Sequence, residues 1–203
     1  IDGIKVGPSP EWMQKLLLAV GLRPINNIVD ITNFILLDLG QPMHAFDKKH
    51  LSGDIITVRR AENDEKFITL DEQEHELTSD MLVIADSEKP VALAGVMGGM
   101  NSEISDDTTT IIFESANFDA TNVRRTATKL GLRTDSSARF EKSLDPNNAE
   151  LALRRAAELT LEICPDAKVV SNVADEKNFS LNQGPIELSL DFLNKKIGKV
   201  IEK

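Results

Sequence analysis

The spacing of apolar residues predicts two helices near the start of the chain. Residues 8–21 and 28–39 repeat apolar side chains at intervals of three and four, and a glycine ends each pattern. We expect Ser9 to cap the first helix, because a hydroxyl accepts hydrogen bonds from the free N–H groups of a first turn. The faces expected to be buried are Trp12, Leu16, Val20 and their neighbours in the first helix and Ile28, Ile31, Ile35 and Leu39 in the second.

After residue 53 the pattern changes to that of β-strands. Short stretches alternate or are apolar over four to eight residues, with Gly, Asp and Asn between them. These stretches are DIITVRRA, EKFITL, EHELT, MLVIAD, KPVALAGVMGG and TTTIIFESANF. The fifth leads into a glycine-rich loop, and the last is rich in the β-branched residues that favour strands.

Helical spacing returns over residues 119–131 and 147–164. The expected face of the second of these helices is Leu151, Ala152, Ala156, Leu159 and Ile163. Between them lies GLRTDSSARFEKSLDP, whose composition fits an exposed loop and the floor of a polar site equally. Because strands and helices come in blocks, we expect an α+β fold, with a mixed, strongly twisted β-sheet packed with several helices around a polar pocket. The polar stretch EKNFSLNQGP indicates a linker, after which IELSLDFLNKKIGKVIEK begins a new apolar pattern.

Composition and charge exclude several classes of protein. The chain has 203 residues and a net charge of −10, so we do not expect this stretch alone to bind nucleic acid tightly, because such binding depends on Lys and Arg neutralising phosphates. The apolar runs are far shorter than the roughly 20 residues that span a bilayer, and the N-terminus has no signal-peptide pattern. Because Ile1 is not an initiator methionine, we expect a piece of a longer protein.

Cysteine and histidine usage predicts no metal site. The single cysteine, Cys164, cannot form an internal disulfide, and without a basic cluster around it the expected state is a buried structural thiol. A chain without disulfides fits a reducing compartment, so we expect a cytoplasmic protein. The histidines have no zinc-motif spacing, and His50 and His75 are expected at the surface. His44, in QPMHAFD, is either a partly buried histidine satisfied by backbone or a functional residue.

Glu114 ends the apolar strand stretch TTTIIFE. Alternation places it on one face with Ile112 and Thr110, whereas Ile111 and Phe113 point the other way. A carboxylate beside such a face is costly unless it is hydrogen-bonded or lies at a pocket. It either reaches solvent at the strand end or faces a ligand hydroxyl, and the residues alone leave both interpretations open.

The glycine loop and the serines add little chemistry by themselves. GVMGG contains Gly95, Gly98 and Gly99 but matches neither Gly-x-Gly-x-x-Gly nor a P-loop, so nucleotide binding is not expected. These glycines fit a plain turn or the close approach of a ligand to the main chain. Ser136 and Ser137 have no nucleophile elbow, so serine catalysis is not predicted.

Four long stretches carry a resemblance to a known family. GPSPEWMQKLLLAVGLRPINNIVDITNFILLDLGQPMHAFD, VALAGVMGG, IIFESANF and RTDSSARFEKSLDP occur in that order. Together they resemble the editing domain of the beta subunit of bacterial phenylalanyl-tRNA synthetase. The resemblance assigns residues 1–178 to that domain, 179–185 to a linker and 186–203 to the truncated start of the following domain. It implies hydrolysis of the ester of mischarged Tyr-tRNA(Phe), because an apolar synthetic site rejects an added hydroxyl poorly.

The resemblance also implies roles for individual residues. Glu114 matches the glutamate that accepts from the tyrosine hydroxyl, with main chain at Gly95 as a second partner, and Gly98 lines the same loop. His44 matches the histidine near the ester and its attacking water. Ser136 stands where the family commonly has alanine. The other matched positions are Thr134 in the pocket wall, with Ser136, and Arg23, Thr32 and Asn33 around the pocket and the tRNA end.

The implied partners are the acceptor end of tRNA(Phe), the tyrosine moiety of mischarged tRNA, the alpha subunit and other beta-subunit domains, and no membrane. No cofactor or metal is expected in this domain, whereas the full synthetase is expected to use ATP and magnesium. The alternative is a non-catalytic structural or tRNA-docking module of the synthetase. A deacylation assay with mischarged tRNA distinguishes the two.

Overall fold

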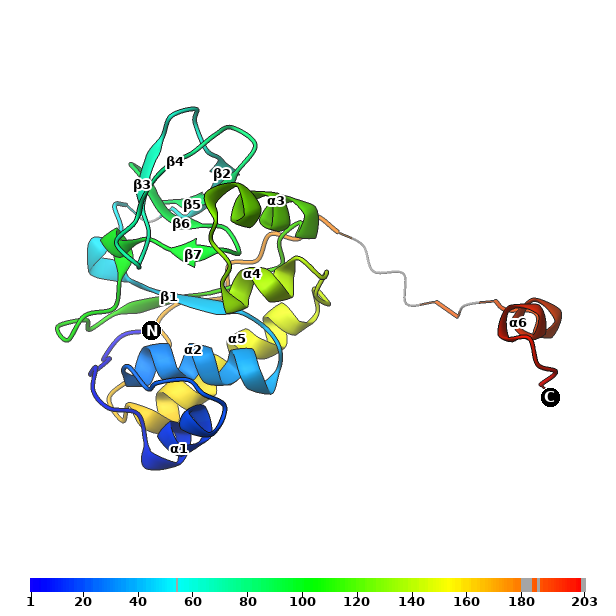
Figure 1. Ribbon diagram of the computed structural model, residues 1–203. Coiled ribbons are helices and arrows are strands. Elements are labelled where there is room, and N and C mark those ends of the chain that lie inside the picture. Colours follow the sequence, from blue (N-terminus) through cyan, green and yellow to red (C-terminus); the bar gives the residue numbers. More distant parts are fainter. Residues whose placement is uncertain (54, 180–183, 186, 202–203) are drawn as a thin grey trace. The chain divides into compact units, whose positions relative to one another are not determined.

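The computed structural model describes residues 1–53, 55–179, 184–185 and 187–201, which divide into two compact units, Ile1–Ser171 and Asn172–Lys203. The first unit combines helices with antiparallel strands, which confirms the α+β class (Figure 1). Its helices are α1 (Glu11–Ala19), α2 (Asn27–Asp38), η1 (Lys48–His50), η2 (Met100–Ser102), α3 (Ala120–Leu130), α4 (Asp135–Phe140) and α5 (Asn148–Ile163). Its strands are β1 (Met43–Asp47), β2 (Thr57–Arg60), β3 (Lys66–Ile68), β4 (Glu74–Glu76), β5 (Leu82–Ala85), β6 (Pro90–Leu93), β7 (Met97–Gly98) and β8 (Ile111–Ser115).

The second unit contains α6 (Leu190–Ile197), capped by the hydroxyl of Ser189, which accepts from the backbone N–H of Phe192 (3.2 Å). The predicted limits of the domain, the linker and the following domain stay a prediction. Part of the predicted linker, residues 180–183, and the predicted start of the next domain, residue 186, lie outside the described residues.

The strands of the described chain form three small antiparallel sheets, where the sequence predicted one mixed sheet. β2, β5, β6 and β7 pair in that order, β3 pairs with β4, and β1 pairs with β8. Short connections join β3 to β4, β5 to β6 and β6 to β7, and a short connection allows only an antiparallel pair. β1 was not predicted as a strand, because its partner lies at the far end of the β-rich region.

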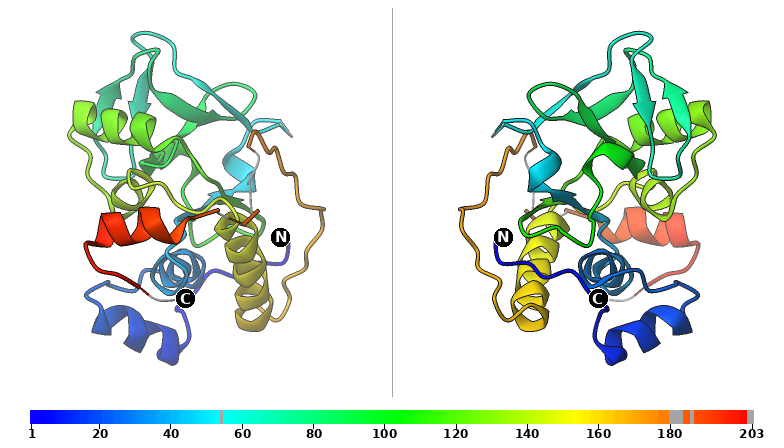
Figure 2. Two further views of the ribbon diagram at one scale, coloured as in Figure 1. Left: turned by 90° about the vertical axis from the view of Figure 1, so that its right-hand side faces the viewer. Right: turned by 90° about the vertical axis from the view of Figure 1, so that its left-hand side faces the viewer.

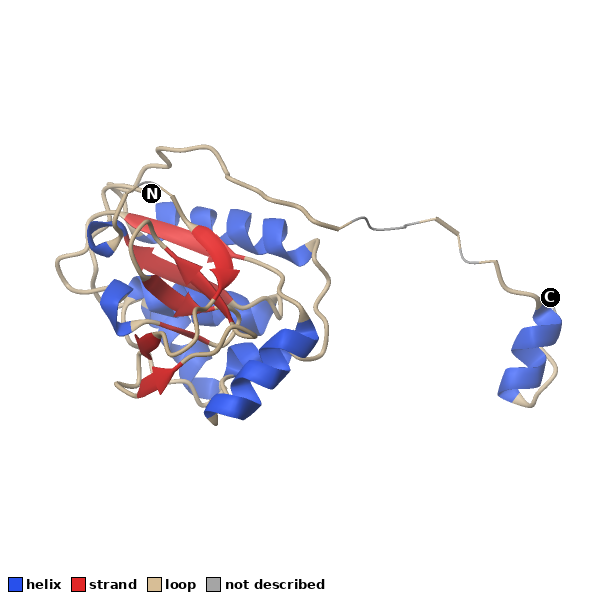
Figure 3. Cartoon of the chain, turned by 90° about the horizontal axis from the view of Figure 1, so that it is seen from above, coloured by secondary structure: helices blue, strands red, loops and turns tan. Residues whose placement is uncertain are grey.

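The β1–β8 pair separates two apolar cores and lies between the other strands and the helices α2 and α5 (Figure 1). Seen from above, the strands of the first unit gather in the middle with helices around and beneath them (Figure 3). On one face, Phe46 and Ile112 pack into the core that the four-stranded sheet covers. On the other face, Ala45 and Ile111 pack with Ile28 of α2. Neighbouring residues of a strand point to opposite faces, so this arrangement confirms the alternation predicted around residue 114.

Helix α2 has α1 and α5 on its two flanks (Figure 2). α1 contributes Met13 and Leu17 to this cluster, and the predicted face was wrong: Trp12, Leu16 and Val20 are 40%, 52% and 58% exposed. α1 carries apolar side chains around most of its circumference, so period alone does not select the buried side. Packing against α2 selects it.

The start of α1 also differs from the prediction. Ser9 is buried, but its hydroxyl donates to the carboxylate of Asp30 in α2 and does not cap α1, whose N-cap residue is Pro10. The other Asp30 oxygen accepts from the backbone N–H of Ile25 (2.8 Å). The serine therefore satisfies a buried carboxylate, which is costly to leave unpaired.

The longer helices begin and end close to their predicted bounds. In α2, Ile28, Ile31 and Ile35 are buried as predicted. In α5, Ala152, Ala156 and Leu159 are buried, but Leu151 is 53% exposed, which corrects its predicted place on the buried face. Adjacent helical positions lie about 100° apart, and the side that faces α2 is centred on the alanines.

The predicted burial of Cys164 is confirmed. Its sulfur accepts from the side-chain amide of Asn27 (3.3 Å), and burial raises the pKa of the thiol, as expected of an unreactive structural cysteine. His50 and His75, expected at the surface, are half-buried.

Candidate functional site

Strand pairing brings His44 of β1 directly opposite Glu114 of β8. The backbone N–H of Lys48 donates to the carbonyl of Thr110 (3.0 Å) in the same register. Because hydrogen-bonded positions recur at every second residue, Phe46, His44 and Pro42 occupy such positions too. Paired side chains at these positions point to the same face, with Cα atoms about 5.5 Å apart. The two candidate residues, far apart in sequence, are therefore neighbours in the fold.

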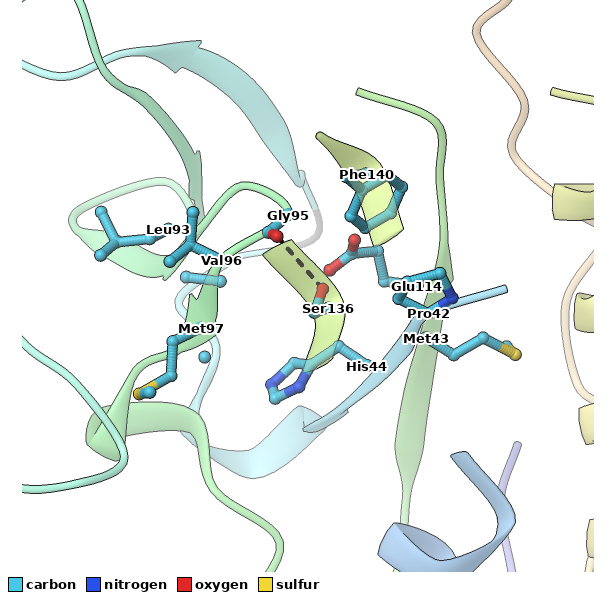
Figure 4. Close-up of a pocket in the computed structure, with 12 residues that line it drawn as sticks. Pro42, Met43, His44, Leu93, Gly95, Val96, Met97, Glu114, Ser136 and Phe140 are labelled. Carbon is cyan, nitrogen blue, oxygen red and sulfur yellow. Dashed lines mark hydrogen bonds between the residues drawn. The ribbon is translucent and has the colours of Figure 1, made fainter. Parts of the chain in front are cut away.

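A cavity of about 80 Å³ opens on this face, between the β1–β8 pair, the loop between β6 and β7, and the start of α4 (Figure 4). Glu114 and Ser136 point into the same space from β8 and α4. The cavity is lined by Pro42, Met43, His44, Ala92, Leu93, Gly95, Val96, Met97, Gly98, Glu114, Ser136 and Phe140. Most of this wall is apolar, and a few polar groups converge in it, as in sites for small ligands.

The Glu114 carboxylate is half-buried in this wall. Burial disfavours its charged form and raises its pKa to about 7. At neutral pH, the carboxyl group is therefore close to its midpoint. In the ionised form it is a strong hydrogen-bond acceptor whose natural partner is a donor inside the cavity.

The imidazole of His44 is held differently. Its ring packs edge-to-face on Phe46 with 4.6 Å between centroids, and its Nε2 atom is buried without a hydrogen-bond partner among the described residues. Burial lowers the pKa of His44 to about 4, so the ring is neutral at pH 7. A neutral imidazole has one nitrogen free to accept a hydrogen bond.

Gly98 makes room for this ring. A Cβ atom at Gly98 would lie 2.4 Å from His44 Cε1, 2.7 Å from Nε2 and 3.1 Å from Cδ1 of Leu70. The two distances to His44 are far below van der Waals contact, and the distance to Leu70 is short of it by a few tenths of an ångström. The glycine is therefore required for the present position of the His44 ring.

We expect Gly98→Ala to displace the His44 ring and to lower the free energy of unfolding by about 1–3 kcal/mol, the usual range for overpacking. Urea denaturation and the ¹⁵N shifts of the imidazole measure the two effects. Gly7→Ala is the matched control, because a Cβ at Gly7 meets nothing within 4 Å. Unchanged imidazole shifts in Gly98→Ala would contradict the prediction.

Helix α4 closes the cavity with two hydroxyl groups. The Ser136 hydroxyl donates to the carbonyl of Gly95 (3.1 Å), and the Thr134 hydroxyl donates to the carbonyl of Val96 (2.7 Å). Thr134 is also the N-cap of α4, in a capping box with Ser137. The stretch that sequence left open between a loop and a site floor is therefore a short helix whose first turn forms part of the cavity wall.

The main chain at Gly95 adopts φ +70°, a left-handed conformation that favours glycine. A Cβ there would lie 2.9 Å from Val123, 3.0 Å from Phe118 and 3.1 Å from Phe140. The tight packing and the bond from Ser136 together hold the Gly95 carbonyl at the cavity.

The structure brings together five of the nine predicted site residues: His44, Glu114, Gly95, Gly98 and Ser136 line the cavity. The other four, Thr134, Thr32, Asn33 and Arg23, do not line it. Thr134 supports the loop wall as described above. The predicted roles of the other three at the tRNA end stay predictions.

Two of these three lie in α2. The Thr32 hydroxyl donates to the carbonyl of Val29 (2.8 Å), a bond within its own helix, and Asn33 is half-buried. Arg23 is exposed in the link between α1 and α2. A long exposed guanidinium suits contact with a phosphate at the edge of a site better than a place in its interior.

Sequence reasoning missed the apolar part of the wall. These residues are Pro42, Met43, Ala92, Leu93, Val96, Met97 and Phe140. They come from β1, β6, β7 and α4 and the connections beside them, so no local spacing relates them. The nearest signal was their position next to recognised motifs, in QPMHAF, VALAGVMGG and RTDSSARF.

No cluster of His, Cys, Asp and Glu suited to a metal ion occurs among the described residues. Within the same residues, no helix is both long and apolar enough to cross a membrane.

Comparison with known proteins assigns the chain to a domain family. A family model described as the B3/4 domain matches residues 1–165. The phenylalanine--tRNA ligase beta subunit of Clostridium acetobutylicum is 48% identical over 203 residues, which are 100% of this chain and 26% of that protein. The corresponding subunit of Solibacter usitatus is 50% identical over 201 residues, 99% of this chain and 26% of that protein.

A solved N-terminal fragment of the phenylalanyl-tRNA synthetase beta-subunit from Pyrococcus horikoshii aligns over 87% of this chain and 52% of that chain, at 15% identity and a TM-score of 0.46. The chain spans about a quarter of the length of the curated relatives it matches. Because the B3/4 model covers most of its residues, the chain belongs to the B3/4 domain family and corresponds to a segment of phenylalanine--tRNA ligase beta subunits.

Proposed function

We propose that this domain carries out post-transfer editing, in which the ester of Tyr-tRNA(Phe) is hydrolysed and tyrosine is released. The observation that carries the proposal is the cavity with Glu114 on one strand and a neutral His44 opposite it. It supplies an acceptor for a hydroxyl and a group that can hold a water near an ester. The similarity to phenylalanine--tRNA ligase beta subunits supplies the class of substrate.

Glu114 accounts for selectivity in this proposal. The phenol of tyrosine donates a hydrogen bond to the carboxylate, whereas phenylalanine would leave this half-buried acceptor unpaired. Sites that require a hydroxyl reject analogues without it by about 10⁴ or more. The Gly95 carbonyl is a second acceptor in the cavity wall, although Ser136 already donates to it.

His44 accounts for the positioning of water. Its imidazole is neutral near pH 7 and accepts a hydrogen bond from a water, which is held toward the ester carbonyl. The water oxygen bonds to the carbonyl carbon, and the bond from that carbon to the ribose oxygen breaks. The ribose oxygen takes up the proton that the water loses, either directly or through the vicinal ribose hydroxyl. The products are tyrosine and tRNA(Phe), and the step uses no metal.

We expect His44→Ala to lower the rate of Tyr-tRNA(Phe) hydrolysis by roughly 10- to 100-fold, the loss typical of a misplaced reactant. The measurement is deacylation of mischarged tRNA by the full two-subunit ligase. His50→Ala is the control, because His50 is half-buried on η1 and does not line the cavity. An unchanged rate in His44→Ala would remove His44 from the mechanism.

The remaining elements of the proposal concern the whole protein. They are a cytoplasmic phenylalanine--tRNA ligase that uses ATP and magnesium, with an alpha subunit and other beta-subunit domains as partners and the acceptor end of tRNA(Phe) as the delivered substrate. If the full ligase with an intact cavity does not deacylate Tyr-tRNA(Phe), the domain is instead a structural or tRNA-docking module.

A further inference from the structure

The β1–β8 ladder lacks one hydrogen bond next to the candidate site. The register that pairs Met43 with Ser115 places Pro42 opposite Ala116. By the alternation established at Lys48, position 42 is one whose N–H would donate to the carbonyl of the opposite residue. Proline has no N–H group, so it cannot provide that bond.

The side chain of Gln41 occupies this gap. Its Nε2 donates to the carbonyl of Ala116 (2.8 Å) and to the carbonyl of Pro42 (3.0 Å). Both protons of the amide group thus go to the two carbonyls of the incomplete pair. The residue is fully buried, which holds the amide in place.

The Gln41 side-chain amide has a fixed orientation, and its Oε1 atom is left without a partner in the described part of the chain. It is buried and has no hydrogen-bond partner among the described residues. Turning the amide over would direct Oε1 at two carbonyl oxygens, so the two acceptors fix its orientation. A buried oxygen without a partner is costly. Here Oε1 is left without a partner, within the residues that the structure describes, because the amide is oriented so that both of its N–H groups donate to the strand carbonyls.

We propose that Gln41 is a positioning residue, whose side-chain amide replaces the strand hydrogen bond missing at Pro42 and so holds His44 and Glu114 opposite each other at the cavity. The inference rests on the proposed function as far as catalysis is concerned. Its structural part stands on the strand geometry alone.

The position of the amide explains why the effect reaches the site. Pro42 lies on the same face of the strand as His44 and lines the cavity, and Ala116 follows Glu114 by two residues on the opposite strand. Figure 4 shows Pro42 beside Glu114 at this end of the cavity. Without the amide, the Ala116 carbonyl loses the donor that replaces the missing N–H, and the ladder is weakened at the pair next to His44 and Glu114. Strand ends open more readily than strand interiors.

The test compares Gln41→Met, which keeps the length of the side chain without its donors, with the double variant Gln41→Met/Pro42→Ala. The alanine restores a backbone N–H at position 42 that can donate to the Ala116 carbonyl. Thr160→Val is the control, because it too removes a buried side-chain-to-carbonyl bond, here from the Thr160 hydroxyl to Ala156 (2.7 Å), outside the cavity. Pro42→Ala alone is measured as the reference for the double variant.

Two quantities are measured on each variant. The first is the ionisation midpoint of Glu114 in the full 203-residue chain, which is monitored through the ¹³C chemical shift of its carboxyl group during a pH titration. His44 is the other titratable group that lines the cavity, so its titration is recorded in parallel. The second is Tyr-tRNA(Phe) hydrolysis by the full ligase.

We expect Gln41→Met to lower the Glu114 midpoint from about 7 toward the usual carboxyl range, because water reaches an opened strand end. Hydrolysis should fall at least about tenfold. The double variant should recover both values relative to Gln41→Met, and Thr160→Val should change neither.

An unchanged midpoint in a folded Gln41→Met protein, or a double variant no better than the single one, overturns the proposal. If Gln41→Met does not fold, the double variant decides: it folds when the lost donor to the Ala116 carbonyl is the cause. A double variant that stays unfolded while Pro42→Ala alone folds overturns the proposal. If the parent ligase does not edit but the midpoints follow the expected pattern, the proposed function fails and the positioning role of Gln41 stands.

Discussion

Replacing Glu114 with alanine is expected to lower the preference of the site for tyrosine over phenylalanine by at least about 10- to 100-fold. In the parent, the tyrosine hydroxyl donates a hydrogen bond to the carboxylate. Loss of this bond costs roughly 1.5–3 kcal/mol of transition-state stabilisation, which lowers the rate of tyrosyl-ester hydrolysis about 10- to 100-fold. Hydrolysis of the phenylalanyl ester should fall less or rise, because the alanine leaves no unpaired acceptor. The ratio of kcat/KM values for Tyr-tRNA(Phe) and Phe-tRNA(Phe) measures the effect in the full ligase.

Glu162→Ala is the matched control for this experiment, because Glu162 is an exposed carboxylate on α5 that does not line the cavity. It should leave the ratio as in the parent. Discrimination that survives Glu114→Ala would sink the acceptor role and would point to the shape of the apolar wall as the source of selectivity. A loss of both activities with a lower melting temperature would also contradict the prediction, since it would show a structural role only.

Glu114→Gln is expected to stabilise the chain increasingly as pH rises. The folded-state pKa of Glu114, about 7, lies above the ordinary value of 4.5. Between these values the folded protein keeps a proton that the unfolded chain has lost, so the parent loses stability as pH rises through this window. The amide that replaces the carboxyl group carries no charge and avoids this loss. The variant should therefore gain up to about 3 kcal/mol over the parent between about pH 4.5 and about pH 7.5.

Urea denaturation of both proteins at several pH values measures this difference. The parent alone would not show it clearly, because His44 has the opposite effect: its pKa falls from 6.5 to about 4, so it adds stability as pH rises between these two values. Subtracting the parent curve from the Glu114→Gln curve isolates Glu114. Glu162→Gln serves as the control, and a difference that does not change with pH would show that Glu114 is ionised without penalty in the folded protein.

Local sequence pattern predicted those elements whose character depends on near neighbours. α2, α3 and α5 have a clear helical period and recognisable ends, such as Gly131 after α3 and Asp119 before it. β8 has β-branched residues and a strict alternation that placed Glu114 and Ile112 on one face. These features were readable because they involve residues that lie within a few positions of each other.

Local pattern did not predict β1 or the buried side of α1. MHAFD is short and follows a proline, and it is a strand only because β8 offers a partner. α1 has apolar residues on more than one side, and only contact with α2 decides that Met13, and not Trp12, is buried. In both cases the deciding partner is another element, which a helical or strand period does not describe.

The sequence by itself determined the helices with a clear period, the α+β class, the alternation in β8 and the motifs that relate the chain to phenylalanine--tRNA ligase beta subunits. The tertiary structure alone decided that His44 lies opposite Glu114, that Gly98 makes room for the imidazole and that Gln41 bridges the two strands. It also decided the protonation states, because burial sets the pKa values. The physical reason is that strand pairing and desolvation depend on residues far apart along the chain, and these meet only when the chain folds.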